Sequence, residues 1–416
     1  MSADAGGAAA DTDVGLEAGA YDRSIAAIAR RRWEAIKAGD VGNLPVIVGL
    51  LVITVFFQLK NENFLTAGNF TNLITQMAGV TTIAIGVVFV LLLGEIDLSI
   101  GYVSGIAGVV VAELQVPDGS WETKGVVAIV IAVIVTAIVG AFQGSFVAII
   151  GVPSFVVTLA GLLFWQGVII KTIGDTGVIT IEDNTINNVA NYFFSDTAGI
   201  VIAAVASALY AAATIAGVAS RRRHGILTDN MLFVALKLAG LSAVAFAAVI
   251  WANRERGFPF AGLLVIVLLI FWTYVAERTT FGRHVYAVGG SAEAARRAGI
   301  NVRRIRIMVF MISGAMAGLG GVIFAARLNS VDLNAGGGTI LLDAIAAAVI
   351  GGTSLFGGRG RVLSALMGAL IIATVANGID LIGSEASIKF MVTGLILLAA
   401  VTLDTVSRRR LERAGR

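Results

Sequence analysis

The sequence of 416 residues contains no cysteine, only two histidines and few charged residues. Without cysteine the chain can form neither a disulfide nor a thiolate metal site. The two histidines, His224 and His284, lie far apart in arginine-rich segments, so the clustered ligands of a histidine metal centre are missing. Charged residues make up 14% of the chain, against roughly 25% in a soluble domain. We therefore expect no metal site and no soluble enzyme.

Apolar residues are present in excess: 57% of the chain is hydrophobic and the mean hydropathy is +0.90. At about 20 residues per crossing helix, the apolar residues suffice for at most about twelve spans. The sequence predicts an all-α polytopic membrane protein with about twelve transmembrane or re-entrant helices. The expected spans are 44–58, 71–93, 99–115, 125–150, 154–172, 196–218, 231–251, 259–276, 306–328, 341–356, 360–381 and 386–404. The run 44–58 is short, and 341–356 either crosses or re-enters.

The basic residues gather in a few segments between the apolar runs, which is typical of membrane topology rather than of nucleic-acid binding. The clusters are Arg221–Arg223, the segment 277–306 and Arg408–Arg410. With twelve spans and a cytoplasmic N-terminus, the positive-inside rule is satisfied for all three, and both termini are cytoplasmic. Arg254 and Arg256 fall on the opposite side and are an exception.

The same patterns divide the chain into three parts. Residues 1–43 are predicted to be a cytoplasmic N-terminal tail with an amphipathic helix, and 44–404 to be the transmembrane domain. Residues 405–416 form a basic cytoplasmic tail.

A polar break interrupts the apolar residues at Gly94, Glu95, Asp97 and Ser99. An ionisable group at membrane depth costs at least about 2.5–3.5 kcal/mol. One interpretation is a break facing a watery cavity, where the carboxylates bind sugar hydroxyls, a cation or a proton. The other is structural: Gly94 ends one helix, and Asp97 or Ser99 caps the next. The span count places the break near the cytoplasmic face, which favours capping.

A second glycine-rich break, Gly352–Gly358, resembles the first, Gly94–Gly101. Each follows an apolar run ending in glycine and precedes a helix rich in small residues. Paired interrupted helices are typical of internal repeats that surround a translocation site. The sequence therefore indicates either an internal repeat or a chance similarity between glycine-rich membrane helices.

The polar segment from Thr279 to Arg306 predicts a short capped helix, Ala292–Ala298. Ser291 suits the N-cap, and Glu293 suits the positive end of the helix dipole. Arg296 and Arg297 suit the last turn, and Gly299 suits the left-handed position that ends a helix. Gly289 and Gly290 are expected to hinge its other side. Such a helix is typical of docking to another protein; the alternative is a basic loop that only fixes topology.

Three ordered motifs, Gly94–Gly101, Phe281–Gly299 and Gly351–Gly360, resemble the permease subunits of sugar-importing ABC transporters of the ribose/xylose branch. The likeness runs from about Asn69 to Leu403. Added residues around 173–251 make the chain more similar to the xylose-type permease than to the ribose type. The chain itself carries no P-loop for a nucleotide.

This resemblance implies a homodimeric, multi-pass permease of the bacterial inner membrane. Its partners would be a cytoplasmic ATPase subunit, which carries ATP and magnesium, and an extracytoplasmic sugar-binding protein, with no cofactor on this chain. The residues Glu293, Ala294, Arg296, Arg297 and Gly299 match the coupling helix that enters a groove on the ATPase.

The break matches the family's membrane signature at Gly94, Glu95 and Asp97. Many relatives have glycine where this chain has Glu95, so an added carboxylate distinguishes the chain.

We therefore expect an ATP-driven importer of a monosaccharide, xylose or a related pentose, and no enzyme activity on this chain. One alternative is a proton- or cation-coupled secondary transporter that uses Glu95 and Asp97. A passive channel, or an ABC permease for another sugar, a nucleoside or an amino acid, are the others. Phe164, Trp165 and Gln166 are candidates for substrate contact, because an aromatic ring can stack on a sugar; the alternative is packing or lipid anchoring.

Overall fold

The computed structural model describes Arg30 and residues 44–115, 123–225 and 230–413. The helices of the first half are α2 (Leu44–Lys60), α3 (Ala67–Leu92), α4 (Ile100–Glu113), α5 (Gly125–Ser145), α6 (Ser154–Ile173), α7 (Asn184–Asn191) and α8 (Asp196–Arg223). The second half adds α9 (Met231–Ala252), α10 (Phe260–Arg278), α11 (Thr280–Gly290), α12 (Ala292–Arg297), α13 (Val302–Leu328), α14 (Ile340–Ile350), α15 (Leu363–Leu381) and α16 (Ala386–Arg413). Short 3₁₀ or π segments occur at Glu62–Leu65, Phe146–Ile150 and Gly174–Thr176.

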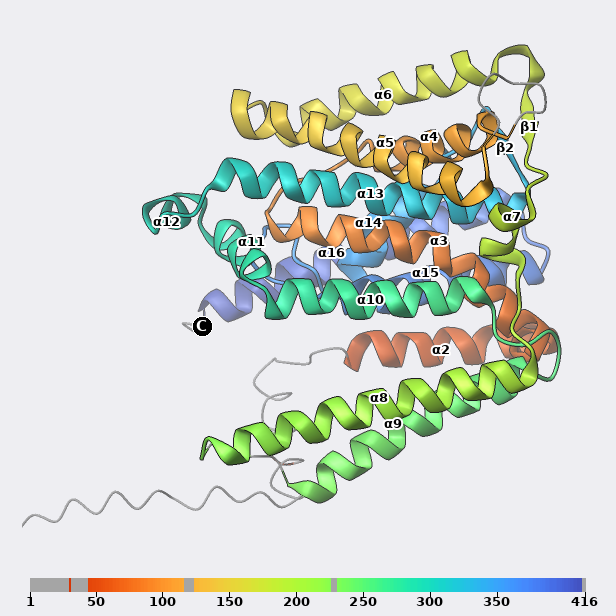
Figure 1. The fold of residues 1–416 in the computed structure, drawn as a ribbon, viewed down its shortest axis with the longest axis vertical. Coiled ribbons are helices and arrows are strands. Elements are labelled where there is room, and N and C mark those ends of the chain that lie inside the picture. The colour runs from red at the N-terminus through yellow and green to blue at the C-terminus, as the bar shows by residue number, and fades with distance from the viewer. Residues whose placement is uncertain (1–29, 31–43, 116–122, 226–229, 414–416) are drawn as a thin grey trace, which may run out of the picture.

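The long helices run side by side as a bundle, lengthwise across Figure 1, with α13 at its centre. Helix α13 packs against α3, α4 and α5. Its glycines allow this, because a Cβ on Gly314 would collide with a carbonyl of α5 and one on Gly321 with a carbonyl of α4. Small residues bring helix backbones together in a membrane, where apolar side chains gain little by leaving lipid. The core of the bundle is therefore held by close backbone contact.

Of the described helices, eight are long and apolar enough to cross a membrane, and four further apolar helices are shorter. The prediction of an all-α polytopic protein is confirmed, but twelve full crossings are not. At about 1.5 Å per residue, α14 extends only about 16 Å and α4 about 21 Å, less than the roughly 30 Å hydrocarbon core. Periodicity and hydropathy located these helices, but the chain breaks on either side shorten them.

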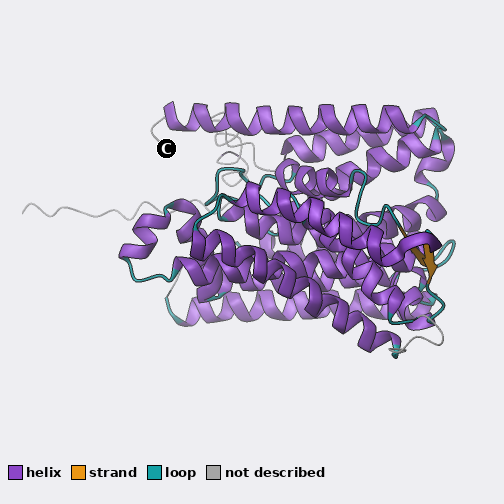
Figure 2. Ribbon diagram, turned by 90° about the horizontal axis from the view of Figure 1, so that it is seen from above, coloured by secondary structure: helices purple, strands orange, loops and turns teal. Residues whose placement is uncertain are grey.

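One end of the bundle carries two strands and a short helix. Strands β1 (Val178–Thr180) and β2 (Ser330–Asp332) pair antiparallel, with Ile179 opposite Val331. Helix α7 lies beside them (Figure 1), and Figure 2 shows the strands among loops at that end. This end joins α6 to α7 and α13 to α14.

The opposite end carries the arginine clusters. Figure 1 places α12 and the C-terminal end of α16 there, together with the ends of α8 and α9 that flank Arg221–Arg223. All three clusters therefore share one end, as the expected topology requires. Helix α16 continues to Arg413, so the basic segment after residue 404 extends a helix. The predicted N-terminal amphipathic helix lies outside the described residues, apart from Arg30.

Arg254 and Arg256, the exceptions to the positive-inside rule, lie at the other end against aromatic rings. The guanidinium of Arg254 lies 4.7 Å from the ring centre of Trp251, and that of Arg256 lies 5.7 Å from Phe193. Cation–π contact gives these charges a local partner. Each of these two arginines therefore has an aromatic neighbour at this end.

Candidate functional site

The polar break lies between α3 and α4. Helix α3 ends at Leu92, Gly94 takes a left-handed conformation with φ 75°, and α4 begins at Ile100. The Asp97 carboxylate, 7% exposed, accepts hydrogen bonds from the backbone N–H of Ser99 (3.0 Å) and from its hydroxyl (2.7 Å). Ser99 makes no side-chain cap bond of its own. Asp97 therefore closes the turn that precedes α4, and its role as a helix cap stays a prediction.

Asp97 also joins the break to other helices. Its second carboxylate oxygen accepts from Ser313 Oγ of α13 at 3.0 Å. The Ser99 hydroxyl lies 2.8 Å from Gln143 Oε1 on α5. Because these groups are buried, the bonds to Asp97 avoid the cost of unpaired polar atoms, whereas Gln143 Nε2 is buried without a partner among the described residues. The side chains of Asp97 and Ser99 therefore connect the break to α13 and α5.

Glu95 forms an ion pair with Arg306. The Glu95 Oε1 to Arg306 Nη2 distance is 3.1 Å, and the two side chains are 14% and 28% exposed. Arg306 lies in the first two turns of α13, shortly after α12 in the chain. Glu95 thus connects the break to the helix that follows the predicted coupling helix.

The three sequence motifs meet at this break. In the glycine loop, the N–H of Gly358 donates to the Leu92 carbonyl at 2.9 Å. A Cβ on Gly94 would lie 3.3 Å from the Phe356 carbonyl, and a Cβ on Gly289 would collide with the Leu92 carbonyl. The end of α3, the glycine loop and the end of α11 are therefore in backbone contact. Whether the two breaks form an internal repeat stays a prediction.

Tyr286 ties α11 to the glycine loop. Its hydroxyl donates to the Gly360 carbonyl at 2.9 Å. Burial and the nearby Glu277 charge raise the pKa of Tyr286 above its ordinary value, so the hydroxyl keeps its proton at neutral pH.

The predicted coupling helix is present as α12, one residue shorter than expected. The Ser291 hydroxyl accepts from the N–H of Ala294 at 3.2 Å, and Gly299 takes φ 84°. Glu293 and Arg297 form an exposed ion pair one turn apart, whereas Ala295 is buried against the bundle. Helix α12 thus protrudes beyond the bundle, as Figure 1 shows. Its docking role stays a prediction.

The expected glycine hinge before α12 is a helix instead. Gly289 and Gly290 form the last residues of α11. The polar segment concealed this helix because its glycines suggested a loop. Gly289 serves close packing against the Leu92 carbonyl, which only the neighbouring helix reveals.

The residues proposed for substrate contact lie on α6, beyond Thr158, whose hydroxyl donates to the Ile96 carbonyl of the break at 3.3 Å. Phe164 is 61% exposed on the surface of the bundle and meets Trp165 edge to face at 4.8 Å between ring centres. Trp165 packs partly against the core. Gln166 lies beside them on the same helix. The structure does not bring these three residues to Asp97, and their contact with substrate stays a prediction.

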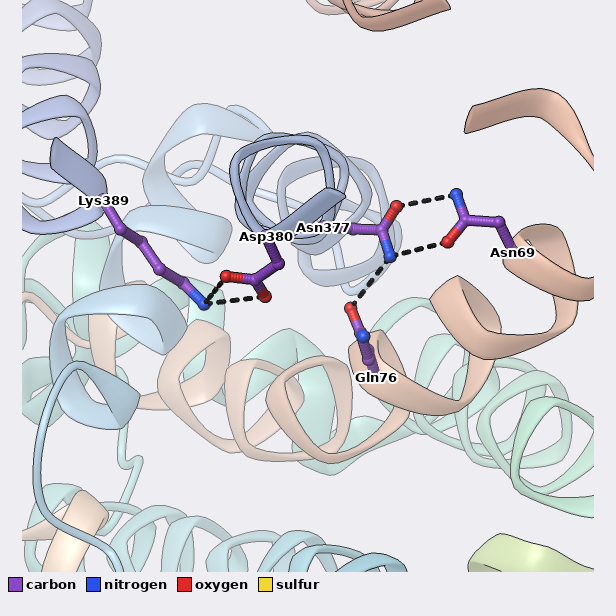
Figure 3. Close-up of polar contacts among 5 residues, drawn as sticks. All are labelled: Asn69, Gln76, Asn377, Asp380 and Lys389. Carbon is purple, nitrogen blue, oxygen red and sulfur yellow. Dashed lines mark hydrogen bonds and ion pairs between the residues drawn. The ribbon is translucent and has the colours of Figure 1, made fainter. Parts of the chain in front are cut away.

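A polar cluster joins α3 to α15 (Figure 3). The side-chain amides of Asn69 and Asn377 exchange two hydrogen bonds, of 2.8 and 2.9 Å, and Gln76 Oε1 lies 3.5 Å from Asn377 Nδ2. One turn further along α15, Asp380 pairs with Lys389 of α16 at 3.3 Å. These amides come from helices more than 300 residues apart in the chain, so their pairing depends on the fold.

A cavity of about 400 Å³ opens at the end that carries the strands. Helices α4 and α13 and strand β2 line it, with Ser104, Phe324, Asp332 and Asn334 among its side chains. It combines an aromatic ring with hydrogen-bonding groups. In the part of the chain that the structure describes, no group of three or more histidine, aspartate or glutamate residues could hold a metal ion.

Comparison with known proteins identifies the family. The model of the family described as branched-chain amino acid transport system / permease component matches residues 69–401. The xylose transport system permease protein XylH of Haemophilus influenzae is 35% identical over 88% of this chain and 96% of its own. XylH of Escherichia coli K12 is 36% identical over 91% of this chain and 95% of its own. The ribose import permease protein RbsC of Bacillus subtilis is 30% identical over 88% and 94%.

No solved structure matches the chain. The family match covers most of the transmembrane helices described above, together with the break, α12 and the glycine loop. The chain therefore belongs to the branched-chain amino acid transport system / permease component family, as a multi-pass protein of the bacterial inner membrane that is similar to the xylose-type and ribose-type permeases.

Proposed function

We propose that the chain is the membrane-spanning subunit of an ATP-driven importer of a monosaccharide, xylose or a related pentose. The names of the XylH and RbsC relatives, a xylose transport permease and a ribose import permease, support a sugar substrate. In this proposal a separate cytoplasmic subunit binds ATP and magnesium and hydrolyses the nucleotide. An extracytoplasmic protein delivers the sugar, and two copies of the chain form the permease.

The observation that carries the proposal is the continuous contact from α12 to the break. Helix α12 protrudes at the arginine-rich end, which the positive-inside rule assigns to the cytoplasm. It leads directly into α13, whose Arg306 holds Glu95, and its preceding helix α11 touches the end of α3 and the glycine loop. A displacement of α12 by an ATPase therefore moves both breaks of the membrane domain.

In this mechanism, ATP binding closes the partner ATPases and pushes on α12. The short apolar helices α4 and α14, which begin or end at the breaks, shift against the long helices, and the permease opens toward the sugar-binding protein. Hydrolysis reverses the motion and releases the sugar inward. The sugar-binding protein supplies most of the selectivity, so few polar contacts are needed along the path.

The secondary-transporter alternative needs carboxylates that can exchange a proton or cation. Glu95 is paired with Arg306, and Asp97 accepts three hydrogen bonds at its two oxygens. Such fixed partners favour a structural role for both groups. This supports the ATP-driven proposal over coupling through these residues.

The test is charge reversal on α12 in the complex reconstituted with its ATPase and binding protein. Glu293→Arg or Arg296→Glu is expected to abolish sugar-stimulated ATP hydrolysis, because these exposed side chains lie on the docking helix. The matched control is Glu62→Arg, an equal charge change on an exposed short helix at the other end. The coupling role is refuted if both α12 variants keep full sugar-stimulated hydrolysis.

A second measurement separates the function classes. Uptake that continues with an uncoupler while ATP is held constant, and stops when ATP is removed, is expected of the ATP-driven importer. Uptake that collapses with the uncoupler alone would identify the secondary transporter, and uptake indifferent to both would identify a channel.

A further inference from the structure

A groove of about 380 Å³ lies between α8, α9 and α10 at the arginine-rich end of the bundle. Three cations from three different helices line it: Arg221 of α8, Lys237 of α9 and Arg278 of α10. Its other lining side chains are uncharged, and include the apolar Val218 and Phe233. The groove thus combines a strongly positive rim with apolar walls.

The groove exists because the α8–α9 hairpin packs against the bundle mainly at its far end. The buried residues of α8 are Gly199 and Ala203, near its first residue. Those of α9 are Val249 and Ala252, near its last residue, and Val234, which lines the groove. Figure 1 shows the hairpin at the edge of the bundle. Toward the arginine-rich end, Val218, Phe233 and Val234 form the apolar walls of the groove.

Among the described residues, the three cations are exposed, and no acidic residue accompanies them in the groove. In the part of the chain that the structure describes, none of them forms an ion pair. Like charges that share one cavity repel one another. Arg278 is the last residue of α10, and Arg221 lies in the last turn of α8. Both therefore lie at the end of an apolar helix, the level at which the phosphate groups of a bilayer are expected.

The ammonium group of Lys237 can reach the same membrane level as the guanidinium groups of Arg221 and Arg278. It lies six residues after Met231, the first residue of α9, which is about 9 Å along the helix axis. A lysine at that depth extends its aliphatic stem along apolar surface and brings its ammonium to the headgroup region. The three charges therefore converge at headgroup level, above apolar walls.

We propose that this groove is a binding site for an anionic phospholipid of the surrounding membrane. Its phosphate is held by Arg221, Lys237 and Arg278, and its acyl chains fill the gap beside Val218 and Phe233. Arginine suits this role because its planar guanidinium can form two hydrogen bonds to a phosphate. Basic pockets between membrane helices are a recurring form of lipid recognition. The lipid would fix the peripheral hairpin to α10.

The test is native mass spectrometry of the purified full-length chain with added phosphatidylglycerol or phosphatidylcholine. A basic residue near the membrane surface changes affinity for anionic lipid about fivefold. The variant Arg221→Gln/Lys237→Gln/Arg278→Gln is therefore expected to bind phosphatidylglycerol about a hundredfold more weakly. The control Arg223→Gln/Arg303→Gln/Arg304→Gln removes three cations of the same end that do not line the groove, and is expected to change affinity less than threefold.

A second variant keeps every charge. Gly217 lines the groove, and a side chain built on it meets nothing within 4 Å, so Gly217→Trp is expected to fold normally and exclude the acyl chains. It should weaken phosphatidylglycerol binding while leaving the cations in place.

Three results would overturn the proposal. The first is equal affinity for the two lipids in the unmodified chain, and the second is undiminished binding by the Arg221→Gln/Lys237→Gln/Arg278→Gln variant. The third is equal binding of glycerophosphoglycerol, which lacks acyl chains, or displacement by millimolar inorganic phosphate, because either would identify a soluble anion as the ligand.

Discussion

Breaking the ion pair between Glu95 and Arg306 tests whether the break is held to α13 by charge. At 3.1 Å, the pair attracts by about 5 kcal/mol at an effective dielectric constant of about 20. Most of this attraction is offset by the cost of removing both charges from water. Removing one partner is different, because it leaves the other charge largely buried and unpaired.

The expected magnitudes follow from this asymmetry. Loss of one member of a fully buried pair costs about 3–5 kcal/mol, and the 14% and 28% exposure of these side chains lowers the expectation to about 2–3 kcal/mol. Glu95→Gln and Arg306→Gln are each expected to destabilise the fold by that amount. The double variant should cost less than the sum of the two by about 2 kcal/mol, since neither charge is then stranded.

The assay is reversible unfolding of the detergent-solubilised chain, measured for the four members of the double-mutant cycle. The control cycle is Glu293→Gln with Arg297→Gln, an exposed pair on α12, for which little coupling is expected. In the reconstituted complex, the single variants should also lower sugar-stimulated ATP hydrolysis, and the swap Glu95→Arg/Arg306→Glu should restore part of it. Strictly additive free energies in the Glu95–Arg306 cycle would refute the reasoning.

Three further predictions concern the contacts around the break. Gly289→Ala should lower the free energy of unfolding by about 1–3 kcal/mol, because the added Cβ collides with the Leu92 carbonyl of α3. The control Gly290→Ala should be neutral, because its Cβ meets no atom within 4 Å. Equal unfolding transitions for the two variants would contradict this prediction. Asp97→Asn, which keeps an acceptor oxygen, should lower the free energy of unfolding by about 1 kcal/mol, and Asp97→Ala should lower it more. Unfolding of the variants, compared at matched expression, measures this. Normal stability with lost transport would instead indicate that Asp97 lines the translocation path. Tyr286→Phe should cost about 1 kcal/mol through its lost hydrogen bond to the glycine loop. Burial raises the pKa of Tyr286 in the folded state above its ordinary value of 10.0. The stabilisation by this hydrogen bond is therefore fully present below pH 10.0 and is lost as the pH rises through the raised pKa of the folded state. A measurement of unfolding free energy against pH that shows the loss between about pH 6 and 9 would contradict this.

The positions of several membrane helices were predictable from hydropathy together with the residues that bound each apolar run. The expected spans 154–172, 231–251 and 259–276 end within two residues of the observed α6, α9 and α10. These helices have long apolar runs bounded by proline, asparagine or charged residues, so local signals fix their limits. The run expected at 341–356 was too long: α14 ends at Ile350, because the following glycines form the loop that contacts the break.

The candidate site was predictable in its members but less so in its contacts. The sequence identified Gly94, Glu95 and Asp97 as a break and Ser291 as an N-cap, since these depend on neighbouring residues. It did not predict the helix α11 or the partner of Glu95. Arg306 lies more than two hundred positions from Glu95 in the chain, and nothing local relates the two.

The sequence by itself determined that this is an all-α membrane protein, that its basic residues gather in a few clusters, and that α12 is a capped helix. Composition, periodicity and capping are local properties, and each can be evaluated within a few turns of chain. Only the tertiary structure decided which surfaces meet: the three glycine motifs in backbone contact, the pairing of Glu95 with Arg306, and the basic groove beside α8 and α9. These depend on how distant helices approach, and that approach is set by glycines whose close contacts exist only after folding.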